Sequence, residues 1–250
     1  MICWRCFVAC GFITLSTLGC GDGANSTGKY SQQVVQETNV AKLLKEANVS
    51  QKAQGFLKEG NNLFNSHRYG EAIAAYDKAL SINPDIADAW INRGNALTAL
   101  QFYQEALVSF DKAIMIEPKK QEAWFNRGNA LTKLQRVQDA LAAYDKVIAI
   151  KSNSSDAYDA WINRGITLVK LKRYTAALAS YDKAIALNPN KQEAYYNKAC
   201  AYALQNNLEL AIENLQKAIK VVPQKYKQLA KTDSDFDKLR KDKQFQELIQ

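Results

Sequence analysis

The chain has 250 residues, of which 47% are hydrophobic and 23% are charged, and it carries a formal net charge of +8. The apolar share is typical of a protein that buries a core, and with only four prolines the chain can form long helices. Residues 216–250 hold nine basic and five acidic side chains, which is half of the excess positive charge. A groove that follows a nucleic-acid backbone needs basic residues along its whole length, so this distribution argues against one.

Residues 1–20 form an apolar leader in which Arg5 is the only charged residue. Residues 6–18 are apolar or small, a run too short to span a bilayer but typical of the apolar core of a secretory signal. The leader ends in Thr-Leu-Gly-Cys, which resembles the cleavage box of bacterial lipoproteins. This resemblance implies that Cys20 becomes the lipidated first residue of the mature protein. Thr17 departs from the Leu that this family prefers three places before the cysteine.

We therefore expect a lipoprotein anchored at the cell envelope, or a secreted or periplasmic protein. The alternatives are a leader retained as a hydrophobic anchor and a start codon placed too early, which would make the protein cytoplasmic. Removal of the leader would leave Cys20 and Cys200 as the only cysteines, so no disulfide framework is expected. We expect residues 21–52 to form a polar tether followed, from about residue 32, by a possible N-terminal capping helix.

The rest of the chain repeats one motif at intervals of 34 to 37 residues. The motif reads AWINRGNAL from Ala89, AWFNRGNAL from Ala123, AWINRG from Ala160 and, more weakly, AYYNKA from Ala194. A further copy begins near Ala53. Self-similarity at a fixed period of this length indicates stacked copies of one helical unit.

Each copy places the same kinds of side chain at the same positions, counted so that the tryptophan of the motif is fourth. The fourth position is aromatic, the eighth small, the twentieth alanine and the twenty-fourth aromatic or Leu, and a proline stands thirty-second in four copies. Positions four and eight share one helix face, where small residues let two helices approach and aromatic rings fill the remaining space. The fourth and eighth residues are Phe56 and Gly60, Trp90 and Gly94, Trp124 and Gly128, Trp161 and Gly165, and Tyr195 and Ala199.

This pattern closely resembles the tetratricopeptide repeat across residues 53–226. The resemblance implies an all-α fold, a right-handed superhelical solenoid of about five helix hairpins whose concave groove is lined mainly by the first helix of each pair. We expect residues 227–250 to form C-terminal capping helices, with Asp235 and Asp242 as N-caps, that cover the edge of the last repeat. The five repeats are predicted at about residues 53–86, 87–120, 121–157, 158–191 and 192–226.

Two departures from the family pattern carry structural predictions. The third repeat has three extra residues, with the polar segment 152–155 in place of the proline turn, and we expect this insert to loop out at the surface. The seventh position, usually Leu in the family, is basic in four repeats, and the twenty-fifth is Asp in four. Pairing these residues between successive repeats leaves only Glu59 and Gln216 over, one at each end. We therefore predict inter-repeat ion pairs between Asp77 and Arg93, Asp111 and Arg127, Asp145 and Arg164, and Asp182 and Lys198.

The candidate binding residues are asparagines that recur on the first helix of each pair. An amide side chain both donates and accepts hydrogen bonds, so a row of amides can hold the backbone of an extended peptide. Family members with such asparagine ladders bind peptides in this way. The alternative is that these residues belong to the general family pattern and cap local backbone groups. They are Asn92, Asn126, Asn163 and Asn197 at the sixth position and Asn61, Asn95 and Asn129 at the ninth.

Other groove positions indicate the kind of partner. The second position is acidic in four repeats, whereas family members that clamp a C-terminal carboxylate have basic residues there, so such a clamp is not expected. The groove floor becomes apolar toward repeats four and five, where we expect an apolar anchor of the partner to dock. The acidic residues are Asp88, Glu122, Asp159 and Glu193, and the apolar ones are Ile162, Ile166, Val169, Tyr196, Ala203 and Leu204.

The sequence offers little for catalysis. His67 is the only histidine and lies in a predicted turn, and Cys200 has no histidine near it in the sequence. The glycines occupy packing positions of the repeat and do not form a phosphate-binding loop. We therefore expect no catalytic residue, no metal site, no cofactor and no small-molecule substrate.

These observations favour a non-catalytic scaffold that binds a peptide or helical segment of a partner protein in the concave groove. One alternative is an adaptor subunit of an envelope enzyme or transport complex that docks by its convex face. A third reading, from a different class, is a nucleic-acid binder that uses the basic C-terminal end, although no nucleic acid is expected as the main partner.

Overall fold

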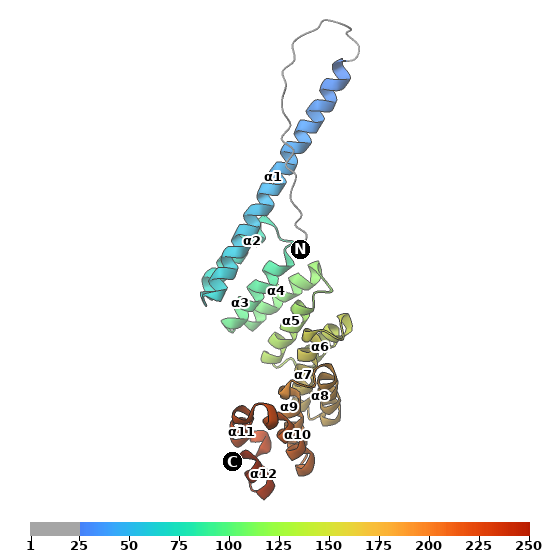
Figure 1. The fold of residues 1–250 in the computed structure, drawn as a ribbon. Coiled ribbons are helices and arrows are strands. Elements are labelled where there is room, and N and C mark those ends of the chain that lie inside the picture. Colours follow the sequence, from blue (N-terminus) through green and yellow to red (C-terminus); the bar gives the residue numbers. More distant parts are fainter. Residues whose placement is uncertain (1–25) are drawn as a thin grey trace. The chain divides into compact units, whose positions relative to one another are not determined.

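The computed structural model describes residues 26–250, which contain twelve α-helices, one 3-10 helix and no strand (Figure 1). The predicted all-α class is therefore confirmed for the described residues. The chain divides into two compact units, one ending at Asn48 and one running from Val49 to Gln250. The predicted leader with Cys20, and residues 21–25 of the predicted tether, lie outside the described residues.

Helix α1 (Ser26–Asn65) is the longest element and contributes to both units. Residues 26–31, which the composition assigns to a tether, are helical, and the possible capping helix from residue 32 is continuous with the first helix of repeat one. In the first unit, apolar side chains such as Leu44, which is 65% exposed, face solvent. Although α1 is long, no helix among the described residues is both long and apolar enough to cross a membrane.

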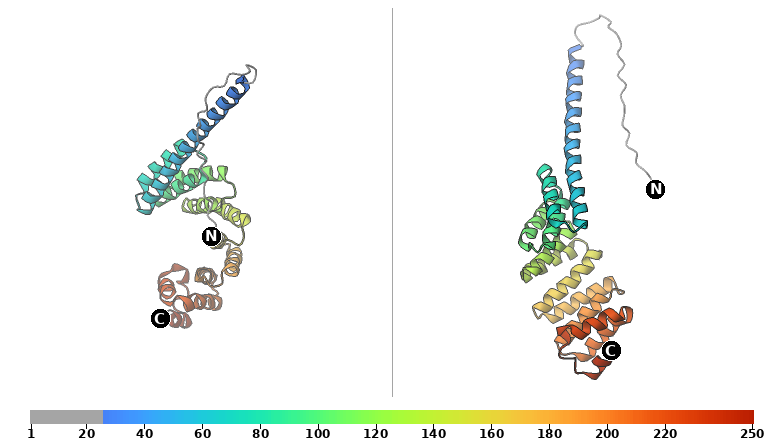
Figure 2. Two further views of the ribbon diagram at one scale, coloured as in Figure 1. Left: turned by 45° about the horizontal axis from the view of Figure 1, so that its top comes forward. Right: turned by 90° about the vertical axis from the view of Figure 1, so that its left-hand side faces the viewer.

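The second unit is a stack of helix hairpins, and each helix packs against the next one along the chain (Figure 2). Buried residues form a chain of apolar clusters that pass from hairpin to hairpin and not one central core, as expected when each repeat contacts only its neighbours. The first hairpin joins the end of α1 to α2 (Tyr69–Ile82). The others are α3 (Ala87–Ala99) with α4 (Tyr103–Ile116), α5 (Gln121–Lys133) with α6 (Val137–Ile150), α7 (Ser155–Lys170) with α8 (Tyr174–Leu187), and α9 (Gln192–Leu204) with α10 (Leu208–Val221).

A glycine facing an aromatic ring sets the close approach of the two helices in four of the hairpins. In the third hairpin, a Cβ added to Gly128 would lie 2.6 Å from Cε1 of Tyr144, a separation that real Cβ atoms do not adopt. The rings at this position are at most 1% exposed, so they have no room to withdraw. The fifth hairpin uses Ala199 with the smaller Leu215 instead, which keeps the combined volume similar.

Each hairpin turn contains one residue with a left-handed backbone, and none of these residues is glycine. The connection is only a few residues long, so the chain must reverse sharply between the two helices. In the second hairpin the reversal is closed by a 2.9 Å hydrogen bond from the backbone N–H of Phe102 to the carbonyl oxygen of Leu97. Non-glycine residues occupy this conformation at a cost of about 1–2 kcal/mol. The φ angles are 59° at His67, 65° at Gln101, 60° at Gln135, 57° at Lys172 and 60° at Asn206.

The predicted ladder of inter-repeat ion pairs is confirmed. Each basic side chain approaches the aspartate of the preceding hairpin and also lies over an aromatic ring of its own helix; the guanidinium carbon of Arg127 is 5.7 Å from the ring centre of Trp124. The arginines are only about a quarter exposed, whereas the aspartates are about half exposed. The N–O distances are 2.7 Å for Arg93–Asp77, 2.7 Å for Arg127–Asp111, 2.8 Å for Arg164–Asp145 and 2.5 Å for Lys198–Asp182.

The polar insert of the third repeat does not simply loop out. Its last residues start α7 earlier than the corresponding helices, because the hydroxyl of Ser154 caps the helix by accepting from the N–H of Ala157 at 3.0 Å. The side-chain amide of Gln121 donates to the Ser154 hydroxyl and to the carbonyl oxygen of Lys151, each at 3.1 Å. The insert is therefore tied to α5, the first helix of its own repeat.

The chain ends in a cap made of α11 (Pro223–Thr232), the 3-10 helix η1 (Ser234–Phe236) and α12 (Lys243–Ile249). Phe236 and Phe245 are fully buried against the apolar edge of the fifth hairpin. Asp242 caps α12 as predicted, since its carboxylate accepts from the N–H of Phe245 at 3.1 Å. The N-cap predicted at Asp235 is wrong. Asp235 lies inside η1, and Asp233 is the N-cap of this 3-10 helix, because its carboxylate accepts from the N–H of Asp235 at 3.0 Å.

Candidate functional site

The predicted asparagines lie on successive first helices and are joined to one another by side-chain hydrogen bonds. In each case an amide N–H at the sixth position of one repeat donates to the amide oxygen at the ninth position of the preceding repeat. The helix stack brings these residues together although they are about one repeat apart in the sequence. The bonds are Asn92 to Asn61 at 2.9 Å, Asn126 to Asn95 at 2.8 Å and Asn163 to Asn129 at 2.9 Å.

Tyrosine hydroxyls of the second helices donate hydrogen bonds to two of the acceptor amides. The hydroxyl of Tyr76 donates to Asn61 at 3.0 Å, and that of Tyr144 donates to Asn129 at 2.8 Å. Burial raises the pKa of both tyrosines to about 12, so both hydroxyls keep their protons at neutral pH. In the second hairpin the ring is Phe110, which has no hydroxyl. The orientations of the Asn61 and Asn129 amides are therefore set by hydrogen bonds within the protein.

The ladder leaves some hydrogen-bonding groups of the sixth-position amides unused. Each sixth-position amide uses one N–H, and its oxygen accepts no hydrogen bond from the described residues. An amide can form about four hydrogen bonds, so unused capacity remains on every rung. A cavity of about 310 Å³ opens at the first rung, beside Asn61, Asn92 and Asn95. The structure therefore shows that these asparagines join successive repeats through their side chains.

The ladder stops between repeats four and five. The ninth position of repeat four is Ile166, which has no amide oxygen to offer. Asn197 therefore stands apart from the other predicted asparagines, and its side chain has no hydrogen-bond partner among the described residues. It lines a second cavity of about 430 Å³.

This second cavity, called the α7–α9 pocket below, contains half of the apolar floor predicted for repeats four and five. Ile166, Val169 and Leu204 line it. The other three expected floor residues, Ile162, Tyr196 and Ala203, are instead buried in the core. The helix phase explains this difference, because their side chains point between helices and not into the groove.

Six further residues line the α7–α9 pocket and were not predicted from the sequence: Lys170, Lys172, Tyr174, Tyr181, Cys200 and Asp235. Tyr181 is at the twenty-fourth position and Cys200 at the ninth position of their repeats, and both are almost fully buried. Asp235 belongs to the C-terminal cap and reaches the pocket only because the chain folds back after α11. The sequence predicted that this cap covers the last repeat, but not that Asp235 reaches the pocket.

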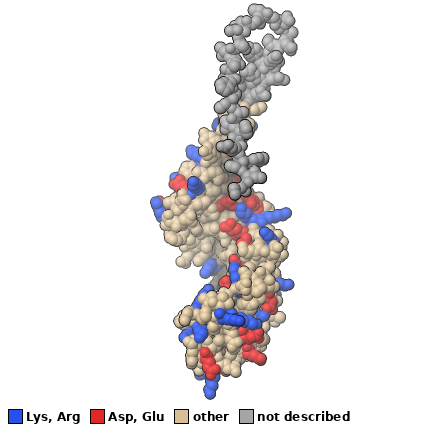
Figure 3. All heavy atoms as spheres, viewed as in Figure 1, with Lys and Arg blue, Asp and Glu red and all other residues tan. Residues whose placement is uncertain are grey.

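The acidic rim predicted at the second position is partly neutralised. Nζ of Lys120 lies 2.6 Å from a carboxylate oxygen of Asp88, and Nζ of Lys191 lies 3.5 Å from one of Asp159. The hydrogen bond to Asp88 raises the pKa of Lys120, so this lysine stays charged. On the face drawn in Figure 3, acidic and basic side chains are interspersed along the described repeats.

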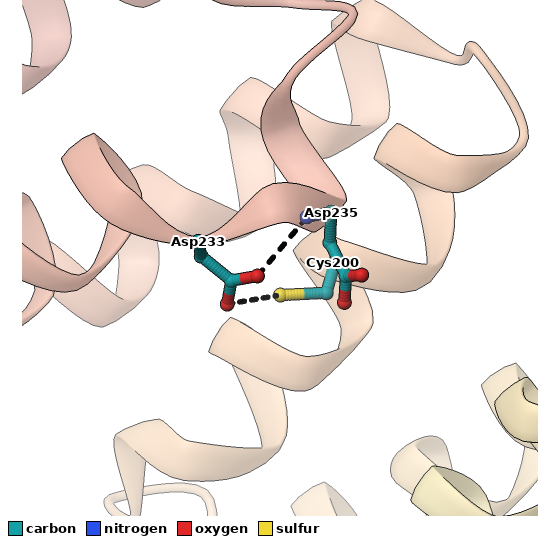
Figure 4. Close-up of side chains that lie close together, drawn as sticks. All are labelled: Cys200, Asp233 and Asp235. Carbon is teal, nitrogen blue, oxygen red and sulfur yellow. Dashed lines mark hydrogen bonds between the residues drawn. The ribbon is translucent and has the colours of Figure 1, made fainter.

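One thiol and two carboxylates meet beside the α7–α9 pocket (Figure 4). Ligand atoms of Cys200, Asp233 and Asp235 lie within 4.8 Å of one another. The Asp233 carboxylate is already engaged: it accepts from the Tyr196 hydroxyl at 2.8 Å and from the Cys200 thiol at 3.8 Å. Burial raises the pKa of Cys200, which disfavours the thiolate that a metal would need. These contacts account for the cluster as a structural junction.

Comparison with family models places the repeats. Models described as "Tetratricopeptide repeat" match residues 87–120, 122–154, 158–191 and 193–225, and one described as "TPR repeat" matches residues 60–101. The chain belongs to the tetratricopeptide repeat family. This family assignment agrees with the resemblance noted in the sequence and with the solenoid of helix hairpins. No curated protein matches the chain at a significant level.

Solved tetratricopeptide structures share the fold. YrrB, described as "a TPR protein with an unusual peptide-binding site", is 27% identical, with a TM-score of 0.59; the match covers 73% of this chain and 92% of YrrB. MamA is 23% identical with a TM-score of 0.61, covering 67% of this chain and 96% of MamA. PilW, described as a "widely conserved type IV pilus biogenesis factor", is 22% identical with a TM-score of 0.61, covering 76% of this chain and 98% of PilW. At these identities MamA and PilW support the fold alone.

Proposed function

We propose that this tetratricopeptide protein is a non-catalytic scaffold that binds an extended peptide or helical segment of a partner protein in its concave groove. The observation that carries the proposal is the asparagine ladder. Three amide pairs, spaced one repeat apart, leave oxygen and N–H groups open on the first helices. Such groups match the alternating donors and acceptors of a peptide backbone, whatever its side chains.

Preorganisation makes the ladder suitable for this role. Each amide is already held by a neighbouring amide, and two rungs are also held by tyrosine hydroxyls. Binding a peptide therefore immobilises fewer side chains than it would on a surface of free asparagines, which lowers the entropy cost of binding. The printed description of YrrB as a protein with a peptide-binding site lends further support.

Docking by the convex face remains the second candidate, and one observation favours it. Val108 and Met115 lie seven residues apart on α4, so they share one side of the helix, and they are 54% and 74% exposed. The equivalent positions of the other repeats hold alanine, serine, glutamate or lysine. At these two positions, repeat two therefore presents large exposed apolar side chains where the other repeats have small or charged ones.

A peptide-display selection on the full chain tests the groove. Short random peptides that bind the protein are retested, by fluorescence anisotropy, against the triple variant Asn92→Ala, Asn126→Ala, Asn163→Ala. We expect affinity to fall at least roughly tenfold, because each lost hydrogen bond contributes about 0.5–1.5 kcal/mol.

The control for this experiment is the double variant Tyr76→Phe, Tyr144→Phe. It frees Asn61 and Asn129 from the tyrosine hydroxyls but leaves every asparagine of the ladder in place, and Phe110 shows that the fold accepts a phenylalanine there. Because only part of the preorganisation is lost, this variant should lose less affinity than the triple asparagine variant. If the selected peptides bind the triple asparagine variant normally and instead lose affinity with Val108→Ala, Met115→Ala, the partner docks on the convex face and the groove proposal is wrong.

We also propose that the protein is anchored at the cell envelope through a lipid on Cys20. The support is the apolar leader and the cleavage-box resemblance in the sequence. Mass spectrometry of the protein from its native cells tests this: the mature chain should begin at Cys20 with acyl chains attached. An unmodified chain that begins at Met1 would instead support a cytoplasmic protein.

A further inference from the structure

The α7–α9 pocket combines apolar walls with one unpaired carboxylate. Its walls come from Ile166 and Val169 on α7 and Leu204 on α9, and its most buried surface comes from Tyr181. Its volume of about 430 Å³ is within the range of pockets that enclose a small molecule or a large side chain. Asp235 contributes the only carboxylate among the pocket-lining residues.

The Asp235 carboxylate lacks a cationic partner. Within the described residues it forms no ion pair, and the polar side-chain group beside it is the Cys200 thiol (Figure 4). Burial and the neighbouring carboxylates of Asp233 and Asp237 raise the pKa of Asp235, and the nearby Cys200 thiol offsets only part of this effect. The charged form is therefore partly desolvated and lies near two other carboxylates.

This carboxylate decides which occupant fits. A purely apolar side chain would take still more water from an unpaired charge, and burying an unpaired charge is costly. A side chain with an alkyl stem and a terminal cation would use the same apolar walls and would also pair with the carboxylate. The pocket therefore calls for a different anchor from the apolar one expected from the sequence.

We propose that the α7–α9 pocket binds an arginine or lysine side chain of a partner peptide, with the stem against Ile166, Val169 and Leu204 and the cation at Asp235. Asn197, whose amide is left over from the ladder, holds the peptide backbone at the mouth. Lys170 and Lys172 also line the pocket, but both are exposed, so solvent and salt screen their repulsion of the ligand cation. This proposal rests on groove binding and names the side chain that the groove selects.

Three capped pentapeptides test the proposal on the full chain. Each has a central residue flanked by alanines, and that residue is arginine, norleucine or glutamate. Norleucine has an alkyl stem without the charge. Binding is followed by NMR through the methyl groups of Ile166, Val169 and Leu204 and the side-chain amide of Asn197. We expect the arginine peptide to shift these signals and to bind roughly five- to tenfold more tightly than the norleucine peptide, with the glutamate peptide the weakest.

Two variants make the result specific. Asp235→Asn keeps the shape of the side chain and should abolish the preference for arginine over norleucine, leaving norleucine binding unchanged. Glu247→Gln removes one negative charge from an exposed site of the same cap and should leave the preference unchanged. A purely structural role of Asp235 would weaken all peptides equally.

The outcomes also separate this proposal from groove binding itself. If the norleucine peptide binds in the groove as tightly as the arginine peptide, the cation proposal is overturned and groove binding stands. If the arginine preference survives in Asp235→Asn, the carboxylate is not its source and the proposal is again overturned. If no peptide shifts either these signals or those of the ladder asparagines, both proposals fail.

Discussion

Single atoms control the spacing of the helices in this solenoid. Gly60, Gly94, Gly128 and Gly165 each face the edge of an aromatic ring, and in each case an added methyl group would overlap the ring. The helical periodicity predicts where these glycines lie, but the aromatic ring on the partner helix decides whether a larger side chain fits there. A glycine on an open side of a helix has no such constraint, and Gly55 on α1 is an example.

These two glycines make a matched pair of stability predictions. Gly128→Ala should destabilise the protein by about 1–3 kcal/mol, because Tyr144 is buried and cannot yield without distorting the hairpin. Gly55→Ala meets nothing within 4 Å and should stabilise α1 by up to about 1 kcal/mol through helix propensity. Urea unfolding followed by circular dichroism measures both. Equal effects of the two substitutions would show that ring contact does not limit helix spacing.

At the scale of elements, side-chain ion pairs and amide hydrogen bonds join each hairpin to the next. The ion pairs and the amide ladder both connect successive repeats, and in each case the partner sits about half a repeat or a whole repeat away in the sequence. Two of the arginines gain a second partner within their own repeat: Arg93 donates to the Ser109 hydroxyl at 2.8 Å and Arg164 to Ser180 at 2.7 Å. Arg127 has Ala143 at that place, so its ion pair can be measured without this contribution.

A double-mutant cycle on Asp111→Ala and Arg127→Met isolates this inter-repeat ion pair. We expect a coupling energy of about 0.2–1 kcal/mol that decreases as salt is added, because the aspartate is half exposed. Methionine keeps an apolar stem over Trp124, so lost packing is largely cancelled. Chemical unfolding at low and high salt provides the measurement. The intrahelical pair Arg136–Asp139 serves as the reference; a coupling above about 2 kcal/mol, or one unaffected by salt, would contradict the expectation.

At the scale of the whole second unit, each hairpin is stabilised by the hairpins next to it, because the unit has no central core. The last hairpin has no sixth repeat to cover it, and Phe236, Leu239 and Phe245 of the cap bury its apolar edge instead. The hydroxyl of Tyr196 adds a polar link from α9 to Asp233 of the cap. Damage to the cap should therefore be felt mainly at the C-terminal end.

Removal of residues 233–250 tests this one-dimensional behaviour. Exposing the surface covered by three large side chains should cost roughly 5 kcal/mol of local stability, and α9 and α10 should lose hydrogen-exchange protection. Helices α3 to α6 lie two or more hairpins away and should keep theirs. Phe236→Ala should give the same pattern to a smaller extent. A uniform loss of protection along all the described helices would instead indicate a single cooperative core.

The sequence by itself determined the repeat period, the all-α class and the inter-repeat ion pairs. These features follow from regular helices stacked on near neighbours, where spacing along the chain translates directly into spacing in space. Only the tertiary structure decided that the asparagines bond to one another, which floor residues are buried, and that Asp235 reaches the α7–α9 pocket. The physical reason is that these contacts depend on side-chain direction and on the return of the chain after α11. The repeat period predicts neither of these two features.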